Sequence, residues 1–187
     1  MADRLVTRFR GWISRTRSPG DMPEELFDVV DEQDRVIGQL PRSQVHAERR
    51  LHRAVHIFVF NSAGLLLIHK RAASKDEQPN KWTSSASGHL SAGEEYDETA
   101  HREMHEEIGL SGKLEFLHKF PASPETSYEH TALYRMSSDE NPVFDPREIA
   151  EGIYCRLDEI ELQLNADPTR FATAFQVLFR WYLEHFG

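Results

Sequence analysis

Three glutamates stand close together in the segment GHLSAGEEYDETAHREMHEEIGL, which runs from residue 88 to residue 110. On a helix, where each residue advances by about 100°, Glu103, Glu106 and Glu107 would share one face. Like charges at this spacing repel by roughly 0.2–0.5 kcal/mol per pair, so they do not stabilise the helix itself. A hard divalent cation prefers carboxylate oxygens and would remove the repulsion. The pattern therefore indicates either a metal site or a solvated charged face.

The residues around these glutamates have the periodicity of an amphipathic helix. The apolar positions recur every fourth residue, at Tyr96, Ala100, Met104 and Ile108, and form a stripe along one side of the helix. Gly109 follows the stripe and is expected to end the helix in a left-handed conformation, with Leu110 folding back onto it. Arg102 can pair with Glu94, Glu98 or Glu106, and such a pair would orient a ligand carboxylate.

The elements that must position this helix read as short strands and further helices. Before it, we expect two strands around a turn in residues 26–41, a hairpin in 54–71 broken at 61–64, and a short strand in 82–90. After it, we expect strands in 113–120, 127–136 and 152–157, a short acidic helix near 158–164 and an amphipathic helix in 168–186. Strands mixed with two or three helices predict an α/β or α+β sandwich.

Composition limits the class of protein. A chain of 187 residues with 39% hydrophobic and 28% charged residues is most simply one globular domain. The net charge of −9 argues against a general binder of nucleic acid or anionic membranes, whereas a few local cations suffice for a small anionic substrate. A single cysteine, Cys155, fits a reducing compartment. No apolar run approaches the roughly 20 residues of a membrane span, and a cytoplasmic protein is expected.

The two ends of the chain differ from the middle. Residues 1–20 hold five arginines and one acidic residue, and we expect residues 1–24 to be a loosely ordered basic extension. The alternative is an amphipathic helix that touches a membrane or a partner. The folded domain is then expected at 25–187, and its apolar C-terminal helix makes a homodimer contact plausible.

The acidic segment resembles the signature of the Nudix hydrolase family. Every fixed position of that signature is matched by Gly88, Glu94, Arg102, Glu103, Met104, Glu106, Glu107, Gly109 and Leu110. At about 7% usage per residue type, chance agreement is rarer than roughly one in a million. The resemblance favours the metal site over the solvated face, and it implies an α/β/α sandwich with a mixed β-sheet.

What this resemblance implies chemically is hydrolysis, with Mg²⁺ or Mn²⁺, of a phosphoanhydride in a nucleoside diphosphate linked to another group, or in a similar small diphosphate. The implied metal ligands are Glu103, Glu106, Glu107 and the backbone carbonyl of Gly88. Glu103 is alternatively the base. Glu94 would pair with Arg102 and hold the loop to the helix. The metal would neutralise developing charge on the phosphates and activate a water.

Upstream, the stretches LHRA, FNSAGLLL, KRAASK and SGH resemble isopentenyl-diphosphate isomerase, itself a Nudix superfamily member. The resemblance implies metal-ligand positions at His52 and His89, with His46 one residue out of step. Without the isomerase's chemistry, these histidines would pack in the core or contact substrate. The resemblance also implies diphosphate-binding residues at Arg71 and Lys75, which would otherwise belong to a solvated loop.

The sequence offers four candidates for a catalytic glutamate outside the signature. The isomerase-like strand places Glu129 in a catalytic role, and three other glutamates compete with it: Glu125, Glu148 and Glu151. Two aromatic residues, Trp82 and Tyr128, would either stack on a base or pack in the core.

One departure from the isomerase sequence bears on the choice between a hydrolase and an isomerase. The isomerase requires a cysteine before its Gly-His pair, and this chain has Ser87 there. A serine hydroxyl is far less acidic than a thiol and does not readily exchange a proton with carbon. Cys155 does not match that position, and the Nudix signature is intact. Both features favour a hydrolase; the alternatives are an isopentenyl-diphosphate delta-isomerase and a domain that binds a nucleotide without turnover.

Overall fold

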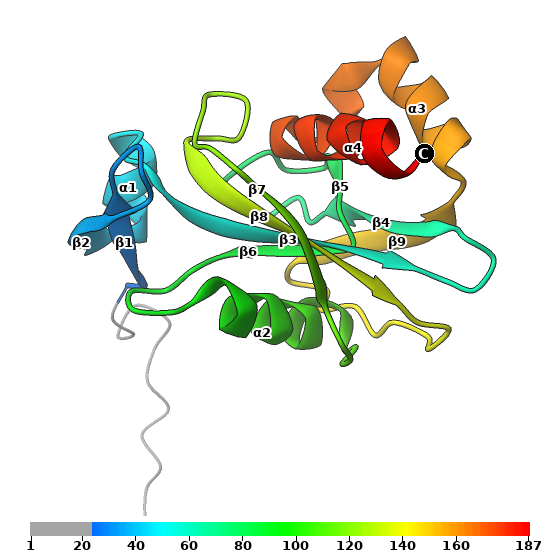
Figure 1. Cartoon of the computed structure of the whole chain (residues 1–187), viewed down its shortest axis with the longest axis horizontal. Coiled ribbons are helices and arrows are strands. Elements are labelled where there is room, and N and C mark those ends of the chain that lie inside the picture. Colours follow the sequence, from blue (N-terminus) through cyan, green and yellow to red (C-terminus); the bar gives the residue numbers. More distant parts are fainter. Residues whose placement is uncertain (1–23) are drawn as a thin grey trace, which may run out of the picture.

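A computed structural model of the chain describes residues 24–187, so the basic segment predicted at 1–20 lies outside the described residues. A mixed seven-stranded β-sheet forms the centre of the molecule, with one helix on one face and two helices on the other (Figure 1). This is the α/β/α sandwich that the sequence predicts. No helix within residues 24–187 is both long and apolar enough to cross a membrane.

The elements follow the expected order. The small sheet pairs β1 (Leu26–Val30) with β2 (Val36–Pro41) and is followed by α1 (Arg42–Ala47). The large sheet contains β3 (His52–Phe60), β4 (Leu66–Arg71), β5 (Trp82–Thr83), β6 (Ala86–His89), β7 (Glu115–Phe120), β8 (Glu129–Ser137) and β9 (Ile149–Cys155). The main helices are α2 (Tyr96–Ile108), α3 (Leu157–Ala166) and α4 (Thr173–Phe186).

Strand β3 is the central strand, and it is apolar on both faces. Val55, Ile57 and Val59 pack in the core beneath α2, whereas Phe58 and Phe60 pack in the core beneath α3 and α4. Alternate residues of a strand point to opposite faces, so one apolar run serves both layers. Strand β8 pairs with β3 in parallel along its whole length, beginning with His52 opposite Glu129.

The hairpin predicted in residues 54–71 forms only at its turn. The Asn61 side chain accepts hydrogen bonds from the turn backbone, but β3 and β4 pair directly only through Phe60 and Leu66. Beyond the turn the strands separate, and β6 pairs with β3 while β9 pairs with β4. Ser85 bridges the gap, because its hydroxyl donates to the carbonyl of Leu67 at 2.6 Å and accepts from the amide of Val59 at 2.8 Å.

Two other segments differ in detail from the sequence prediction. Residues 82–90 form two short strands, since β5 pairs with β4 and β6 pairs with β3. Pro168 begins a separate 3₁₀ turn, Pro168–Arg170, and α4 starts only at Thr173. The interruption has a clear cause: the amide of Ala172 donates to the carbonyl of Trp82 at 2.9 Å, which ties this stretch to β5.

Helix α2 agrees closely with its prediction. Ala100, Met104 and Ile108 are fully buried against the sheet, as their four-residue spacing requires. The helix ends at Gly109, which has a positive φ of 67°, and Leu110 is buried. A left-handed residue at this position is the usual role of glycine at a helix end.

Candidate active site

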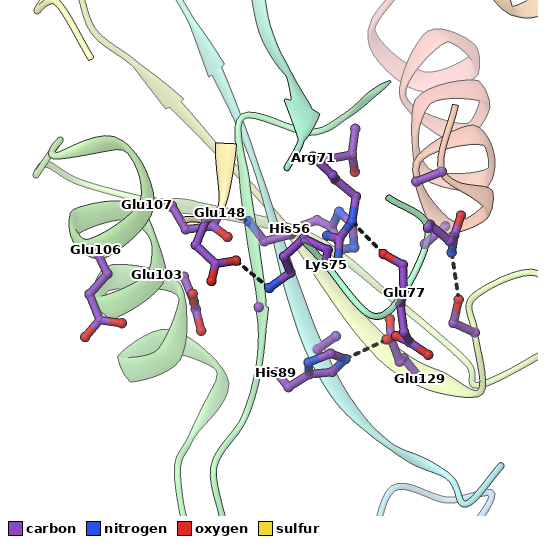
Figure 2. A pocket seen from close by; sticks show the side chains of 18 of the residues that line it. His56, Arg71, Lys75, Glu77, His89, Glu103, Glu106, Glu107, Glu129 and Glu148 are labelled. Atoms are coloured by element: carbon purple, nitrogen blue, oxygen red, sulfur yellow. Dashed lines mark hydrogen bonds and ion pairs between the residues drawn. The ribbon is translucent and has the colours of Figure 1, made fainter. Parts of the chain in front are cut away.

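A cavity of about 640 Å³ opens between α2 and the start of α4. Figure 2 shows glutamates from α2 on one side of it and, facing them, Arg71 at the end of β4 and Lys75 in the segment that follows. The floor is formed by β3 and β6, which pair here through Val55 and Gly88. The β5–β6 segment, which lies between β3 and β4, therefore supplies part of the cavity floor.

The three signature glutamates differ in exposure. Glu107 is 5% exposed and accepts a hydrogen bond from the amide of Ser87 at 2.9 Å. The Glu103 side chain is 13% exposed and that of Glu106 is 59% exposed. Only Glu106 thus fits a solvated charged face. Burial raises the pKa of Glu103 to about 7 and, with repulsion from Glu103, that of Glu107 to about 8.

Gly88 lies against the carboxylate of Glu103. A Cβ atom at Gly88 would lie 2.0 Å from the carboxyl carbon of Glu103, far closer than two carbon atoms can approach. Only glycine therefore lets β6 and the Glu103 carboxylate come together.

Arg102 connects the loop before α2 with the glutamates on the helix. Its guanidinium donates to both oxygens of Glu94 at 2.9 and 2.8 Å, and to Glu103 at 2.7 Å and Glu106 at 3.2 Å. It also donates to the carbonyl of His89 at 3.2 Å. A bidentate arginine–carboxylate pair of this kind fixes geometry. Arg102 thereby orients the signature glutamates relative to β6.

Arg71 is the cation best placed for an anionic ligand. Its Nε donates to the carbonyl of Glu77 at 3.1 Å, and within residues 24–187 no carboxylate lies within ion-pair distance of it. The other cations that line the cavity are paired: Lys75 with Glu148, Arg42 with Asp76, Arg147 with Asp145, and Arg102 with three glutamates. Lys75 also lines the cavity.

The glutamates outside the signature differ in whether they line the cavity. Glu148 lines the cavity, and its charge contributes to the raised pKa of Glu107. Its position is fixed because the amide of Ala72 donates to its carbonyl at 2.9 Å, and the amide of Asp145 donates to the carbonyl of Glu107 at 2.9 Å. Glu129 also lines the cavity, but beside histidines. Two further glutamates, Glu125 and Glu151, do not line it.

Three histidines form a cluster with Glu129. The rings of His46, His52 and His89 lie with their centroids 5.1–5.2 Å apart. Glu129 Oε1 is 2.9 Å from His89 Nε2 and 3.7 Å from His52 Nε2. Helix α1 brings His46 into the cluster, although its sequence position is out of step with the isomerase motif.

The histidine cluster has the donor set of a metal site. Burial lowers the pKa of His52 to about 4 and that of His89 to about 3, so both rings are neutral near pH 7. The Nε2 atoms of His46 and His52 are buried and have no hydrogen-bond partner within residues 24–187. Neutral imidazoles with a carboxylate beside them are typical ligands of a divalent transition metal.

Sequence reasoning missed several residues that line the cavity, among them His56 and Thr83. His56 lies on β3, and its Nδ1 is 2.6 Å from the hydroxyl oxygen of Ser84; a histidine inside the apolar run AVHIFVF was the available signal. Thr83 on β5 lines the cavity and is 1% exposed. Trp82 and Tyr128, the two candidates for base stacking, do not line this cavity.

The comparisons with known proteins agree with the fold and the signature. The family profile described as NUDIX domain matches residues 50–175. An isopentenyl-diphosphate delta-isomerase of Photorhabdus laumondii is 31% identical over 160 residues, covering 82% of this chain and 89% of that protein. A Nudix hydrolase of Deinococcus radiodurans is 28% identical over 170 residues, covering 88% and 98% of the two chains. A crystal structure of a Deinococcus radiodurans protein matches with a TM-score of 0.76 at 29% identity, covering 83% and 98%.

This chain therefore belongs to the Nudix family, and its fold is that of the family's solved structures. The comparisons support a hydrolase of diphosphate compounds as the general activity. Relatives carrying the isomerase name are present alongside the hydrolases.

The buried glutamates predict that stability depends on both pH and metal. Because folding raises the pKa of Glu103 and Glu107 from 4.5 to about 7 and 8, their protonation favours the folded state. That contribution is complete below the unfolded pKa near 4.5 and is lost as the pH rises through 7 and 8. The buried histidines, whose pKa values are lowered, act in the opposite direction. In EDTA, the Tm of the wild type relative to that of Glu107→Gln, which has the same histidines, should therefore be lower at about pH 8.5 than at about pH 6.

Adding Mg²⁺ should raise Tm by at least about 3 °C more at the higher pH, where the cation binds two ionised carboxylates. Glu107→Gln removes one titrating group, so it should reduce the difference between the Mg²⁺-induced increases in Tm at the two pH values. An equal Mg²⁺ effect at both pH values would contradict the prediction.

Proposed function

We propose that this chain is a Mg²⁺- or Mn²⁺-dependent hydrolase that cleaves the phosphoanhydride of a nucleoside diphosphate linked to another group, or of a similar small diphosphate. One observation carries the proposal. The signature glutamates and the unpaired Arg71 face each other across a single cavity (Figure 2). Carboxylates that hold a metal, opposite a cation that holds phosphate, form the arrangement that phosphoryl transfer needs.

The residues present fit a divalent cation. Glu103 and Glu107 lie mostly out of solvent, and this burial is the main cause of their raised pKa values, so a cation beside them would stabilise their ionised forms. We assign the metal to Glu103, Glu106, Glu107 and the carbonyl of Gly88. When bound, the ion would neutralise the diphosphate oxygens and lower the pKa of a water.

The protein's own side chains bind the substrate and accept the proton. Arg71 holds the diphosphate, with Lys75 beside it. The oxygen of a water bonds to one phosphorus, and the bond from that phosphorus to the bridging oxygen breaks. The bridging oxygen leaves with the other phosphate, and the proton of the water passes to a carboxylate. The products are two phosphate monoesters, or one ester and inorganic phosphate from a terminal diphosphate.

The experiment that tests this proposal is a release assay. Phosphate or nucleotide release would be followed with Mg²⁺ and with EDTA over nucleoside di- and triphosphates, nucleotide sugars, dinucleotides and isopentenyl diphosphate. Release that requires the metal supports the hydrolase. Tight binding of a nucleotide with no product would instead support a domain that binds without turnover.

The base outside the signature is predicted to be Glu148, and a matched pair of variants separates it from Glu129. Glu148→Gln should lower kcat by about 10²-fold or more with little change in KM, because a general base typically contributes 10²–10⁴-fold. Glu129→Gln should have the smaller effect on hydrolysis, since Glu129 contacts His89 at 2.9 Å. Steady-state kinetics on the best substrate of the panel would measure both. A larger loss of kcat in Glu129→Gln would assign the base to Glu129.

An isopentenyl-diphosphate isomerase is the second candidate, and the histidine cluster is the observation that favours it. Ser87 counts against it, because its hydroxyl stands where the isomerase needs a thiol. Incorporation of deuterium from D₂O into the allylic carbon of isopentenyl diphosphate, without phosphate release, would establish the isomerase instead.

A further inference from the structure

The cavity has almost no apolar wall. Its apolar side chains within residues 24–187 are three alanines, Ala54, Ala172 and Ala174, and it has no leucine, isoleucine, valine, phenylalanine, tyrosine or tryptophan. Proteins commonly hold a nucleobase by stacking it on an aromatic side chain, and an isoprenoid tail needs large apolar side chains around it. Of the two histidine rings in the wall, His56 is buried and bonded to Ser84, and His89 is half-buried and bonded to Glu129. Neither a base nor a prenyl chain therefore finds its usual partner here.

The end of the cavity next to α4 instead offers hydrogen-bonding groups. Thr83 lines the cavity, and its hydroxyl makes no hydrogen bond to another residue of 24–187. The hydroxyl oxygen of Ser127 accepts from Gln78 at 3.3 Å, which leaves its proton free to donate. The hydroxyls of Thr83 and Ser127 are therefore both available to bond a polar ligand at this end.

This end of the cavity is also held in a fixed shape. The amide of Thr173, the first residue of α4, donates to Gln78 Oε1 at 2.9 Å, and Gln78 Nε2 donates to the Thr173 hydroxyl at 3.2 Å. Gln78 therefore joins the loop after β4 to both α4 and Ser127. Ala172 and Ala174 add only methyl groups, so they leave room beside the hydroxyls. A preformed polar end of this kind can bind a ligand without the entropic cost of ordering its own side chains.

We propose that the α4 end of the cavity, defined by Gln78, Thr83, Ser127, Ala172 and Ala174, binds a compact polyhydroxylated group that is esterified directly to the diphosphate. The substrate class is thus a sugar or polyol diphosphate without a nucleobase. This inference rests on the proposed hydrolase function and names its substrate. Water would convert the sugar diphosphate to the sugar phosphate and inorganic phosphate, with the anhydride bond between the two phosphorus atoms broken.

The test compares four diphosphates at saturating Mg²⁺: a hexose 1-diphosphate, methyl diphosphate, isopentenyl diphosphate and adenosine diphosphate. We expect kcat/KM for the hexose diphosphate to exceed that for each of the others by at least about 10-fold, because a site built around hydroxyls discriminates strongly against ligands that lack them. A preference for adenosine diphosphate or isopentenyl diphosphate would overturn the inference, and so would equal rates on all four. No hydrolysis of any of them, or of the wider panel, would instead overturn the proposed function.

Matched variants assign the preference to this end of the cavity. Thr83→Val keeps the shape of the side chain and removes the hydroxyl, so the ratio of kcat/KM for hexose diphosphate to that for methyl diphosphate should fall by about 10-fold, mainly through KM. Ser127→Gly should act in the same direction, and glycine tolerates the positive φ of 57° at this residue. Thr131→Val makes the same change at a buried position of β8 outside the cavity and should leave the ratio unchanged. A ratio that stays constant in both Thr83→Val and Ser127→Gly would overturn the assignment.

Discussion

Replacing Glu107 by glutamine is expected to lower kcat/KM by at least about 10³-fold, roughly 4 kcal/mol of transition-state stabilisation. Glu107 is the most buried of the signature glutamates, and its charge would be the one least screened by water. Glutamine has the same shape and can still accept the hydrogen bond from the amide of Ser87. The variant therefore removes a metal-binding charge without removing the contact that holds α2 to β6.

The measurement is steady-state turnover with Mg²⁺, together with thermal unfolding to show that the variant folds. Glu98→Gln is the matched control, because Glu98 lies on the exposed side of the same helix and does not line the cavity. It should retain full activity. If Glu107→Gln kept more than about a tenth of the wild-type activity, the assignment of Glu107 to the metal would be wrong.

Replacing Gly88 by alanine is expected to cost about 10²-fold or more in kcat/KM. The new methyl group would lie 2.0 Å from the carboxyl carbon of Glu103, so the carboxylate must move away from its position beside β6. The backbone of Gly88 cannot yield easily, because it pairs with Val55 in the central strand. Misplacing one catalytic group by about 1 Å is enough to cost a factor of this size.

A double-mutant cycle separates this effect from general damage. In a Glu103→Ala background the methyl group at residue 88 meets no carboxylate, so Gly88→Ala should cause little further loss. Gly38→Ala is the control for the substitution itself, since a Cβ atom at Gly38 would meet nothing within 4 Å. Additive losses in the double variant would show that Gly88 acts by some route other than Glu103.

Helix α2 shows how much of the site can be predicted from local sequence patterns. Its apolar stripe, its glycine end and the shared face of Glu103 and Glu106 all follow from the helical repeat of 3.6 residues, and the structure has the helix at Tyr96–Ile108. The match to the Nudix signature also fixes the fold class, which the solved relatives share. The same helical repeat places Glu107 about 20° from the buried Ala100, and what only the structure shows is the contact of its carboxylate with the amide of Ser87 on β6.

The positions of the glutamates outside the signature depend on tertiary structure. Glu148 lies far along the chain from Glu107, and backbone hydrogen bonds from the segment at Asp145 bring it to the end of α2. Glu129 reaches the histidines because β8 pairs in parallel with β3, with His52 opposite Glu129. A parallel pair requires a long crossover, and no local pattern encodes its register.

The sequence by itself determined the family, the position of helix α2 and most of the strands, because each depends on a short motif or on a repeat within one element. Tertiary structure alone decided that the β5–β6 segment separates β3 from β4, that Arg71 has no carboxylate partner within residues 24–187, and that Thr83 lines the cavity. Those features depend on contacts between residues distant in the sequence, and the local pattern of residue types does not encode such contacts.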